Sequence, residues 1–362
     1  MTVTETMKAI VIKDKFKIAV EQVPRPVIEK DTDVIIRMRA SGLCGSDLHV
    51  YRQTDPGTDF IIGHELVGEI VELGSAVKNF KKGDIVASPF ASNCGNCFYC
   101  NKGYTARCTQ AEGYGNAALQ GCQAEYVRQP LADSSLFPVP AGMREEAMLL
   151  LGDILPTGYS CAYHGRRLLD EDDDREMTKP LDAVAVVIGC GPVGLCCISS
   201  AKTMFKTVFA TDPSPSRREL AAKHGAIPVS ADELDAAVRE ATEGRGADAV
   251  LELVGNNAAL KVAMDIVRPF GAVSSIGMHL KPLDLHGEFL YSKNIRMQFG
   301  RCSVRRFFPG ALKVLQLNKE LFDGFIEHRI RLDQAEEYYE LFDKGKIAKT
   351  VFIADDLELT AH

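Results

Sequence analysis

The stretch AVAVVIGCGPVG at residues 183–194 decides the fold of the second half of this 362-residue chain. Its first six residues are apolar and rich in β-branched side chains, and three glycines and a proline interrupt the run that follows. From Ala183 to Ala201 there are 19 residues without a charge, which is near the length of a membrane span. A buried parallel strand that turns into a buried helix explains these features better. The spacing Gly-x-Gly-x-x-Gly between a strand and a helix is typical of a dinucleotide-binding turn.

Each glycine of this turn has its own expected role. Gly189 permits the tight turn after the strand, Gly191 lets the backbone approach a pyrophosphate, and Gly194 lets the helix pack on the strand. The start of the helix offers unpaired amide donors and the positive end of its dipole to the phosphates. The cofactor-binding residues expected here are Gly189, Gly191, Pro192, Val193 and Gly194.

An acidic residue follows the turn at the distance that a ribose contact requires. Asp212 lies 18 positions after Gly194, at the end of the next apolar run. A carboxylate there accepts hydrogen bonds from the adenosine ribose hydroxyls and repels a 2′-phosphate, which favours NAD. Arg217 and Arg218 follow closely and would soften that preference, unless they are surface charges in the first turn of a helix. We expect NAD, with NADP as the less favoured cofactor.

The pattern of apolar runs predicts two domains of different architecture. Residues 183–276 alternate strands with helices, which is typical of a doubly wound parallel sheet (a Rossmann domain). Residues 7–140 instead contain many short strands separated by glycine, proline and charge, which predicts a partly closed barrel. The C-terminal segment breaks the alternation, and we expect it to rejoin the first domain. The expected division is 1–155 with 297–362 for the β-rich domain and 156–296 for the dinucleotide-binding domain.

A compact cluster of cysteines predicts a structural zinc site. Four cysteines with the spacing Cys-x2-Cys-x2-Cys-x7-Cys fall within fifteen residues: Cys94, Cys97, Cys100 and Cys108. Four thiolates match a closed tetrahedral zinc site, and a redox pair would need fewer cysteines. A nucleic-acid zinc ribbon is the other alternative, but only Lys102 and Arg107 supply positive charge inside the loop. We therefore expect structural zinc here and no nucleic-acid partner.

A second, open zinc site is the more consequential hypothesis. A catalytic zinc keeps three protein ligands and one exchangeable position, and the candidates are Cys44, His64 and Asp153. Each alone would more often be an ordinary buried residue. Their surroundings favour a site, because Cys44 lies in a polar segment after an apolar run and Glu65 directly follows His64.

At this point the chain resembles the zinc-dependent alcohol dehydrogenase family of the medium-chain dehydrogenase/reductase superfamily. The resemblance covers nearly the whole length and rests on five segments: Gly42–His49, Gly63–Glu65, the four-cysteine loop, Asp153–Tyr159 and the glycine turn. The acidic stretch 169–179 is the exception, and we interpret it as a solvated loop. The resemblance implies a GroES-like barrel that carries the metals and a Rossmann domain that carries the cofactor.

The resemblance also implies roles around the catalytic zinc. It makes Cys44, His64 and Asp153 the ligands, with Asp153 at a position where the family uses cysteine, aspartate or glutamate. Glu65 would lie near the metal and bind it transiently when no substrate is present. Asp47 would orient the zinc-bound His64, a general need of such sites.

Further roles concern the cofactor and the proton. By the same resemblance, Thr157 would pack against the nicotinamide ring and Lys349 would lie by the cofactor phosphates. Ser46 is two residues from Cys44, so its hydroxyl would reach the open position of the metal and pass a proton, through a cofactor ribose hydroxyl, to His49. Histidine titrates near neutrality and suits such a relay, although a surface histidine is the plainer alternative.

Composition sets the remaining expectations. A net charge of −7 argues against a large phosphate-binding surface and against anionic membranes. Eleven cysteines without a secretory pattern at the N-terminus suit the cytoplasm. An apolar edge strand near Leu290–Phe299 predicts pairing between subunits in a homodimer or homotetramer.

The expected activity is a zinc-dependent transfer of hydride between an alcohol and NAD. One alternative is an NADPH-dependent reductase of carbonyl compounds or conjugated aldehydes in a biosynthetic pathway. A remote alternative is a scaffold that binds zinc and dinucleotide without turnover. A scaffold needs only the closed zinc loop, whereas this chain also has Cys44, His64, Asp153, Ser46 and His49.

Overall fold

The computed structural model of the chain describes residues 5–53, 59–140, 142–169 and 179–357. It divides into two compact units. The first contains residues 1–153, 304–306 and 322–362, and the second contains 154–303 and 307–321. The acidic stretch expected to form a solvated loop lies, apart from its two end residues, outside the described residues.

The first unit is built from two β-sheets. One is a three-stranded sheet in the order β2 (Lys17–Pro24), β1 (Thr6–Asp14), β4 (Phe60–Ile61). The other is a seven-stranded sheet in the order β15 (His328–Ile330), β16 (Thr350–Ile353), β3 (Val34–Leu43), β5 (Leu66–Leu73), β6 (Ile85–Ser88), β8 (Phe137–Pro138), with β7 (Tyr126–Gln129) also paired to β3. All strand pairs in these two sheets are antiparallel except β15 with β16. The short helices of the unit are α1 (Asp47–Tyr51), α2 (Phe98–Asn101), α3 (Ala132–Ser135), α4 (Glu145–Leu150) and α13 (Ala335–Asp343).

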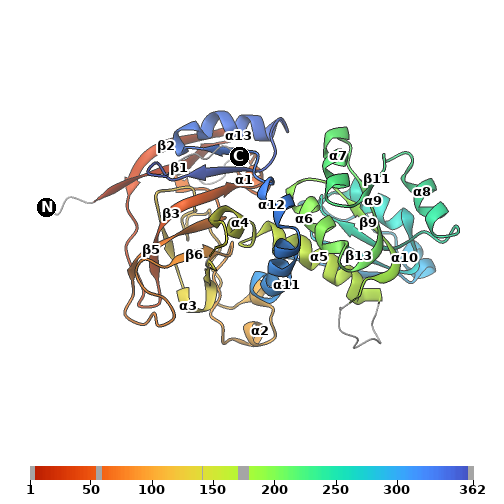
Figure 1. Cartoon of the computed structure of the whole chain (residues 1–362), viewed down its shortest axis with the longest axis horizontal. Helices are drawn as coiled ribbons and strands as arrows, with labels where there is room; N and C mark the ends of the chain where they lie inside the picture. The colour runs from red at the N-terminus through yellow and green to blue at the C-terminus, as the bar shows by residue number, and fades with distance from the viewer. Residues whose placement is uncertain (1–4, 54–58, 141, 170–178, 358–362) are drawn as a thin grey trace. The chain divides into compact units, whose positions relative to one another are not determined.

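The C-terminal segment completes this unit. Strand β16 runs antiparallel to β3, and Val351 pairs with Gly42. In Figure 1, the blue C-terminal strand and helix α13 lie among the red N-terminal strands of the same unit. Phe352 is fully buried with Ile36 and Met38 in the core of the unit. This packing fixes β3, whose end carries Cys44.

The second unit contains a six-stranded parallel sheet (Figure 1). The strand order is β11 (Ile227–Pro228), β10 (Phe205–Thr211), β9 (Leu181–Ile188), β12 (Ala247–Glu252), β13 (Val267–Ser275), β14 (Arg296–Phe299). The helices are α5 (Ile154–Leu169), α6 (Pro192–Ala201), α7 (Pro215–Lys223), α8 (Leu234–Ala241), α9 (Asn257–Ile266), α10 (Gly287–Lys293), α11 (Val304–Leu317, which begins in the first unit) and α12 (Lys319–Asp323, which ends there). The order reverses between β9 and β12, which is the position where such sheets bind ligands.

The boundaries of the two units differ from the expected ranges by two residues near 154, where the second unit begins, and by more after residue 296. The prediction assigned all residues after 296 to the first domain, whereas residues 297–303 and 307–321 belong to the second unit. Strand β14 extends the parallel sheet beside β13, and the ring of Phe307 in α11 lies 5.3 Å from that of Tyr163 in α5.

The expected edge strand at 290–299 is only half a strand. Helix α10 occupies its first part and ends at Lys293, and the next residue, Asn294, has a left-handed backbone conformation. Lys293 anchors the end of this helix by donating hydrogen bonds to the carbonyl oxygens of Met264, Asp265 and Val267. No helix in the described part of the chain is long and apolar enough to cross a membrane.

Candidate metal centres and cofactor turn

Four potential metal ligands converge in the first unit. Each of Cys44, His64, Glu65 and Asp153 offers one atom, and these atoms all lie within 4.8 Å of one another. His64 Nε2 is 3.2 Å and Cys44 Sγ is 3.7 Å from Asp153 Oδ2. Cys44 follows β3, His64 and Glu65 precede β5, and Asp153 lies between α4 and α5. The fold thus gathers one sulfur, one nitrogen and carboxylate oxygens, a donor set that suits zinc.

The partners of His64 orient its ring. Asp47 Oδ1 lies 3.0 Å from His64 Nδ1, which turns Nε2 toward the cluster. Asp47 is itself held, because the backbone N–H of Cys44 and the side-chain amide of Gln123 both donate to its Oδ2. Burial works to lower the pKa of His64, but the charges of Asp47 and Cys44 hold it well above its usual value. A carboxylate behind a histidine is the usual support of a metal ligand.

Glu65 is held by a buried ion pair that the sequence did not predict. Lys349 Nζ donates to Glu65 Oε2 at 2.5 Å and to the carbonyl oxygen of Leu43 at 3.2 Å, and both side chains of the pair are almost fully buried. Among the described residues, no hydrogen-bond donor reaches Glu65 Oε1. A buried carboxylate oxygen without a partner is costly unless a cation satisfies it. This orphaned atom, together with the buried Cys44 thiol, shows that the cluster fits a divalent metal ion.

Lys349 was expected beside the cofactor phosphates. The structure instead places it inside the first unit, with its side chain only 2% exposed and its ammonium group committed to Glu65. Gly42 makes room for this pair, since a Cβ atom there would lie 1.9 Å from Glu65 Oε2.

The two residues of the expected proton relay lie on or next to α1. Ser46 is exposed, and its hydroxyl lies 3.3 Å from Cys44 Sγ and 3.1 Å from His64 Nε2. His49 is half-buried, and burial, followed by the charge of Arg52, lowers its pKa. Ser46 is therefore at the metal cluster, and the imidazole of His49 stays neutral over most of the physiological pH range.

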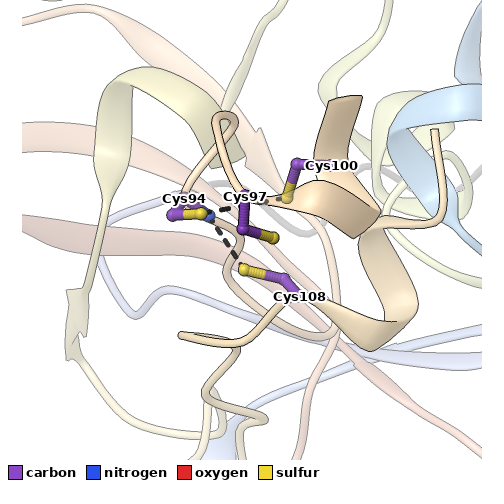
Figure 2. A group of neighbouring side chains, drawn as sticks. All are labelled: Cys94, Cys97, Cys100 and Cys108. Carbon is purple, nitrogen blue, oxygen red and sulfur yellow. Dashed lines mark hydrogen bonds between the residues drawn. The ribbon is translucent and has the colours of Figure 1, made fainter. Parts of the chain in front are cut away.

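The four cysteines of the predicted structural site also converge (Figure 2). Their ligand atoms lie within 4.8 Å of one another, and all four thiols are free of disulfide bonds. Gly95 allows the loop to turn tightly, because its φ is +72°. The loop consists of α2 and a single 3-10 turn at Thr105–Arg107 rather than a larger element.

Backbone amides point at the sulfur atoms of this loop. The N–H groups of Cys94 and Gln110 donate to Cys108 Sγ at 3.2 and 3.3 Å. The backbone N–H of Thr109 does the same for Cys97 and lowers its pKa to about 5. Amide donors of this kind stabilise thiolates, the form of cysteine that binds metal. At Cys108 burial outweighs the two amides and raises the pKa of the thiol, so a cation is needed to hold the thiolate there. The loop therefore fits a four-thiolate zinc site.

The glycine turn in the second unit has the geometry that a phosphate cradle needs. Gly189 has a φ of +96°, which side chains rarely adopt. A Cβ atom at Gly194 would lie 1.9 Å from the Gly189 oxygen, so helix α6 packs directly on the end of β9. A Cβ at Gly191 would meet nothing within 4 Å, which leaves open space in front of the first turn of α6, where Pro192 and Val193 lie. The residues present thus fit a bound pyrophosphate.

Asp212 lies at the end of β10 beside this turn. Its Oδ2 accepts the N–H of Cys190 at 2.9 Å, and its Oδ1 accepts the N–H of Ser214 at 2.9 Å. Arg217 approaches Asp212 Oδ2 only to 3.8 Å and is half-exposed, while Arg218 donates to the Asp212 carbonyl oxygen. The carboxylate is thus fixed next to the turn, and one arginine remains near enough to influence a 2′-phosphate.

Sequence reasoning missed three polar partners that the fold assembles. They are Gln123 behind Asp47, Lys349 behind Glu65, and a group at the ends of β12 and β13 that is described below. Their partners lie far away in the sequence, so no local spacing indicates them. Thr157 lies in the first turn of α5, in the second unit.

Two family models match the chain. Residues 30–141 match the alcohol dehydrogenase GroES-like domain, and residues 192–316 match the zinc-binding dehydrogenase family. Zinc-type alcohol dehydrogenase B of Aspergillus flavus is 43% identical over 98% of this chain and 83% of its own length. The chain belongs to the zinc-dependent alcohol dehydrogenase family of medium-chain dehydrogenases/reductases. It is therefore an oxidoreductase that depends on zinc and acts on alcohols.

Two further relatives agree with this assignment. A medium-chain reductase/dehydrogenase of an Acremonium species is 48% identical over 75% of this chain and 94% of its own length. The solved structure of the alcohol dehydrogenase TADH from Thermus sp. ATN1 is 32% identical and has a TM-score of 0.86, over 96% of this chain and 99% of that chain. The GroES-like and Rossmann folds predicted from the sequence are confirmed.

Proposed function

We propose that this alcohol dehydrogenase transfers hydride reversibly between a small or medium alcohol and NAD, and that each chain holds two zinc ions. Cys44, His64 and Asp153 would hold the catalytic zinc, and Cys94, Cys97, Cys100 and Cys108 the structural zinc. The convergence of Cys44, His64 and Asp153 within 4.8 Å, from positions more than a hundred residues apart, carries the proposal. A panel of alcohols and aldehydes, assayed at the absorbance of the reduced nicotinamide with NAD and NADP, tests it.

Several residues around the metal cluster have separate roles in the proposed reaction. A zinc ion in the cluster supplies Lewis acidity that makes an alcohol hydroxyl easier to deprotonate. Asp47 keeps the His64 ring in the orientation that directs Nε2 to the metal. Lys349 restrains Glu65 by one oxygen and leaves the other without a hydrogen-bond donor, so Glu65 could bind the metal when no substrate does.

The proton of the alcohol needs a way out of the site. Ser46 Oγ is placed to accept it, because this hydroxyl already lies within hydrogen-bond distance of Cys44 and His64. His49, in α1, would take up the proton next and release it to solvent. Its lowered pKa keeps the imidazole neutral, and hence able to accept a proton, to a lower pH than an ordinary histidine.

Replacement of this acceptor has a pH-dependent outcome. His49→Gln should slow alcohol oxidation about tenfold near pH 6, less than the usual contribution of a general acid or base, because His49 does not touch the reacting alcohol itself. The loss should shrink toward pH 9, because hydroxide then removes the proton directly. The measurement is a pH profile of kcat for wild type and variant, with His286→Gln as the control because the His286 side chain is 81% exposed. Parallel profiles for wild type and His49→Gln would remove His49 from the path.

The choice of cofactor can be tested at Asp212. Asp212→Asn keeps the size of the side chain and one oxygen that can accept the backbone N–H of Cys190. It removes the negative charge that favours a ribose hydroxyl and repels a 2′-phosphate. We expect kcat/KM with NAD to fall about tenfold, because a hydrogen bond to a charged group is lost. We expect kcat/KM with NADP to rise about tenfold, because the carboxylate no longer repels the 2′-phosphate. Asp182→Asn is the matched control, since its side chain is 85% exposed in the same unit. An unchanged ratio would mean that Asp212 does not contact the ribose.

A second candidate function rests on Arg217. Its guanidinium group lies near Asp212 yet is half-exposed, so it is available to a 2′-phosphate. The alternative is therefore an NADPH-dependent reductase of carbonyl compounds or conjugated aldehydes, and the same assay panel distinguishes the two. A scaffold without turnover would give no change in absorbance with any combination of substrate and cofactor.

Assembly and compartment complete the proposal. The sheet of the second unit ends in β14, which pairs with β13 on one side. An equivalent β14 on a second copy could pair along its other side, so we propose a homodimer or homotetramer. Eleven free thiols suit a reducing compartment such as the cytoplasm.

A further inference from the structure

Three polar side chains meet at the carboxyl ends of β12 and β13, outside the metal centres. Glu252 ends β12, Ser275 ends β13, and the two residues are register partners in adjacent parallel strands. Ser275 Oγ donates to Glu252 Oε2 at 2.6 Å. His279 Nε2 lies 2.9 Å from Ser275 Oγ and 3.3 Å from Glu252 Oε2. Glu252 is fully buried and the His279 side chain is only 10% exposed, so this is a built cluster and not a surface contact.

The hydrogen bonds of the cluster indicate which ring nitrogen of His279 carries a proton. A serine hydroxyl has one proton, and here it goes to the carboxylate of Glu252. The contact between Ser275 Oγ and His279 Nε2 therefore requires a proton on Nε2. In the neutral ring, Nδ1 is then the acceptor.

The same carboxylate ties down the loop that follows β12. Glu252 Oε1 accepts the N–H groups of Val254 and Gly255 at 2.8 and 2.7 Å. The loop after β13 packs tightly on this one, because a Cβ at Gly277 would lie 2.1 Å from the Gly255 nitrogen. Glu252 thus holds two strand-end loops together by one buried side chain.

These loops border the place where the sheet binds a ligand. Glu252 is the register partner of Ile188, the residue directly before the glycine turn, on the other side of the reversal in strand order. Val254 reaches the turn itself, since a Cβ at Gly189 would lie 2.7 Å from Val254 Cγ2. A dinucleotide spans such a reversal, with one mononucleotide on each half of the sheet. Because β9 and β10 carry the turn and Asp212, the β12–β13 side is left for the other half.

We infer that Glu252, Ser275 and His279 form a positioning cluster for the nicotinamide half of the cofactor. The inference rests on the proposed function, since it presupposes a nicotinamide dinucleotide in the second unit. The cluster acts through the loops that it fixes. Ser275 and His279 hold the Glu252 carboxylate in place, and the carboxylate in turn holds the loop after β12. The nicotinamide end would bind against the loops in this conformation. The adenosine half depends on the turn and Asp212 instead.

Binding of whole and half cofactors tests the assignment. The probes are NADH and NADPH, followed by their own fluorescence because the chain has no tryptophan, and AMP, followed by calorimetry. For Ser275→Ala and His279→Leu we expect the Kd of the reduced dinucleotide to rise about tenfold, the effect of losing a hydrogen bond to a charged group. The Kd of AMP should stay within about twofold of wild type, since AMP lacks the nicotinamide half.

Two further variants keep the outcome interpretable. His279→Gln retains an amide donor toward Ser275 and should recover most of the dinucleotide affinity, while His286→Leu, at an exposed site, should change nothing. Unchanged dinucleotide affinity in Ser275→Ala and His279→Leu overturns the inference, as does an equal loss of affinity for AMP, which would indicate a structural role alone. A wild-type protein that binds neither NADH nor NADPH overturns the proposed function itself.

Discussion

Replacement of Cys44 by serine should leave one zinc ion per chain and lower alcohol turnover by at least about a thousandfold. The serine oxygen is a much poorer zinc ligand than a thiolate, and the remaining His64 and Asp153 cannot hold a three-ligand site alone. The thousandfold figure corresponds to about 4 kcal/mol of lost transition-state stabilisation, a reasonable size for the loss of a Lewis acid. Elemental analysis of the purified protein, beside steady-state kinetics, measures both effects.

The control is another buried cysteine. Cys161 is fully buried in the second unit, and its thiol donates to the Ser274 carbonyl oxygen, a contact that serine can keep. Cys161→Ser should therefore retain two zinc ions and most of the activity. If Cys44→Ser contained no zinc at all, the two sites would not be independent and the assignment of four thiols to a separate ion would be wrong. If it contained two, Cys44 would not be a ligand.

Features that depend on neighbouring residues could be predicted from the sequence. The glycine turn needs only a strand, three glycines and a helix in succession, and Gly189 and Gly194 have the backbone geometry that the spacing indicates. The cysteine loop is equally local, because its four ligands lie within fifteen residues. In both cases the chain itself enforces proximity, so spacing is enough to predict which residues meet.

Contacts between distant residues could not be predicted in this way. Lys349 pairs with Glu65 across 284 positions. The pairing arises because β16 returns to β3 and brings Lys349 against the end of that strand. No periodicity predicts which buried carboxylate meets which buried lysine. The open metal cluster has the same long-range character, and there the family resemblance, more than the residues themselves, indicated Asp153.

The segment 290–299 shows a different limit. A short apolar run fits a strand or a buried helix equally well, so tertiary contacts decide between them. Here Lys293 binds the carbonyl groups at the end of α9, which favours a helix up to that residue, and only Arg296–Phe299 joins the sheet. The prediction of a strand from Leu290 was therefore wrong in its first half.

The second large effect is expected at the four-cysteine loop, on stability and not on chemistry. Cys108→Ser should lose the structural zinc, because a closed site needs all four thiolates and the amides that face Cys108 would no longer stabilise a charge. Structural zinc binds short peptides with about 10 kcal/mol or more, and part of that free energy is folding free energy of the loop. A loss of about 3 kcal/mol would lower the melting temperature by roughly 10 °C.

Limited proteolysis distinguishes local from general destabilisation. Phe98, Tyr99 and Tyr104 are exposed aromatic residues on this loop, so a protease that cleaves after aromatic residues should cut Cys108→Ser between positions 98 and 104 and spare the wild type. Cys161→Ser again serves as the matched control. The variant should keep its other zinc ion and, at low temperature, much of its activity, because the open cluster shares no ligand with the loop. A variant that resists the protease and melts with the wild type would show that the loop folds without a metal ion.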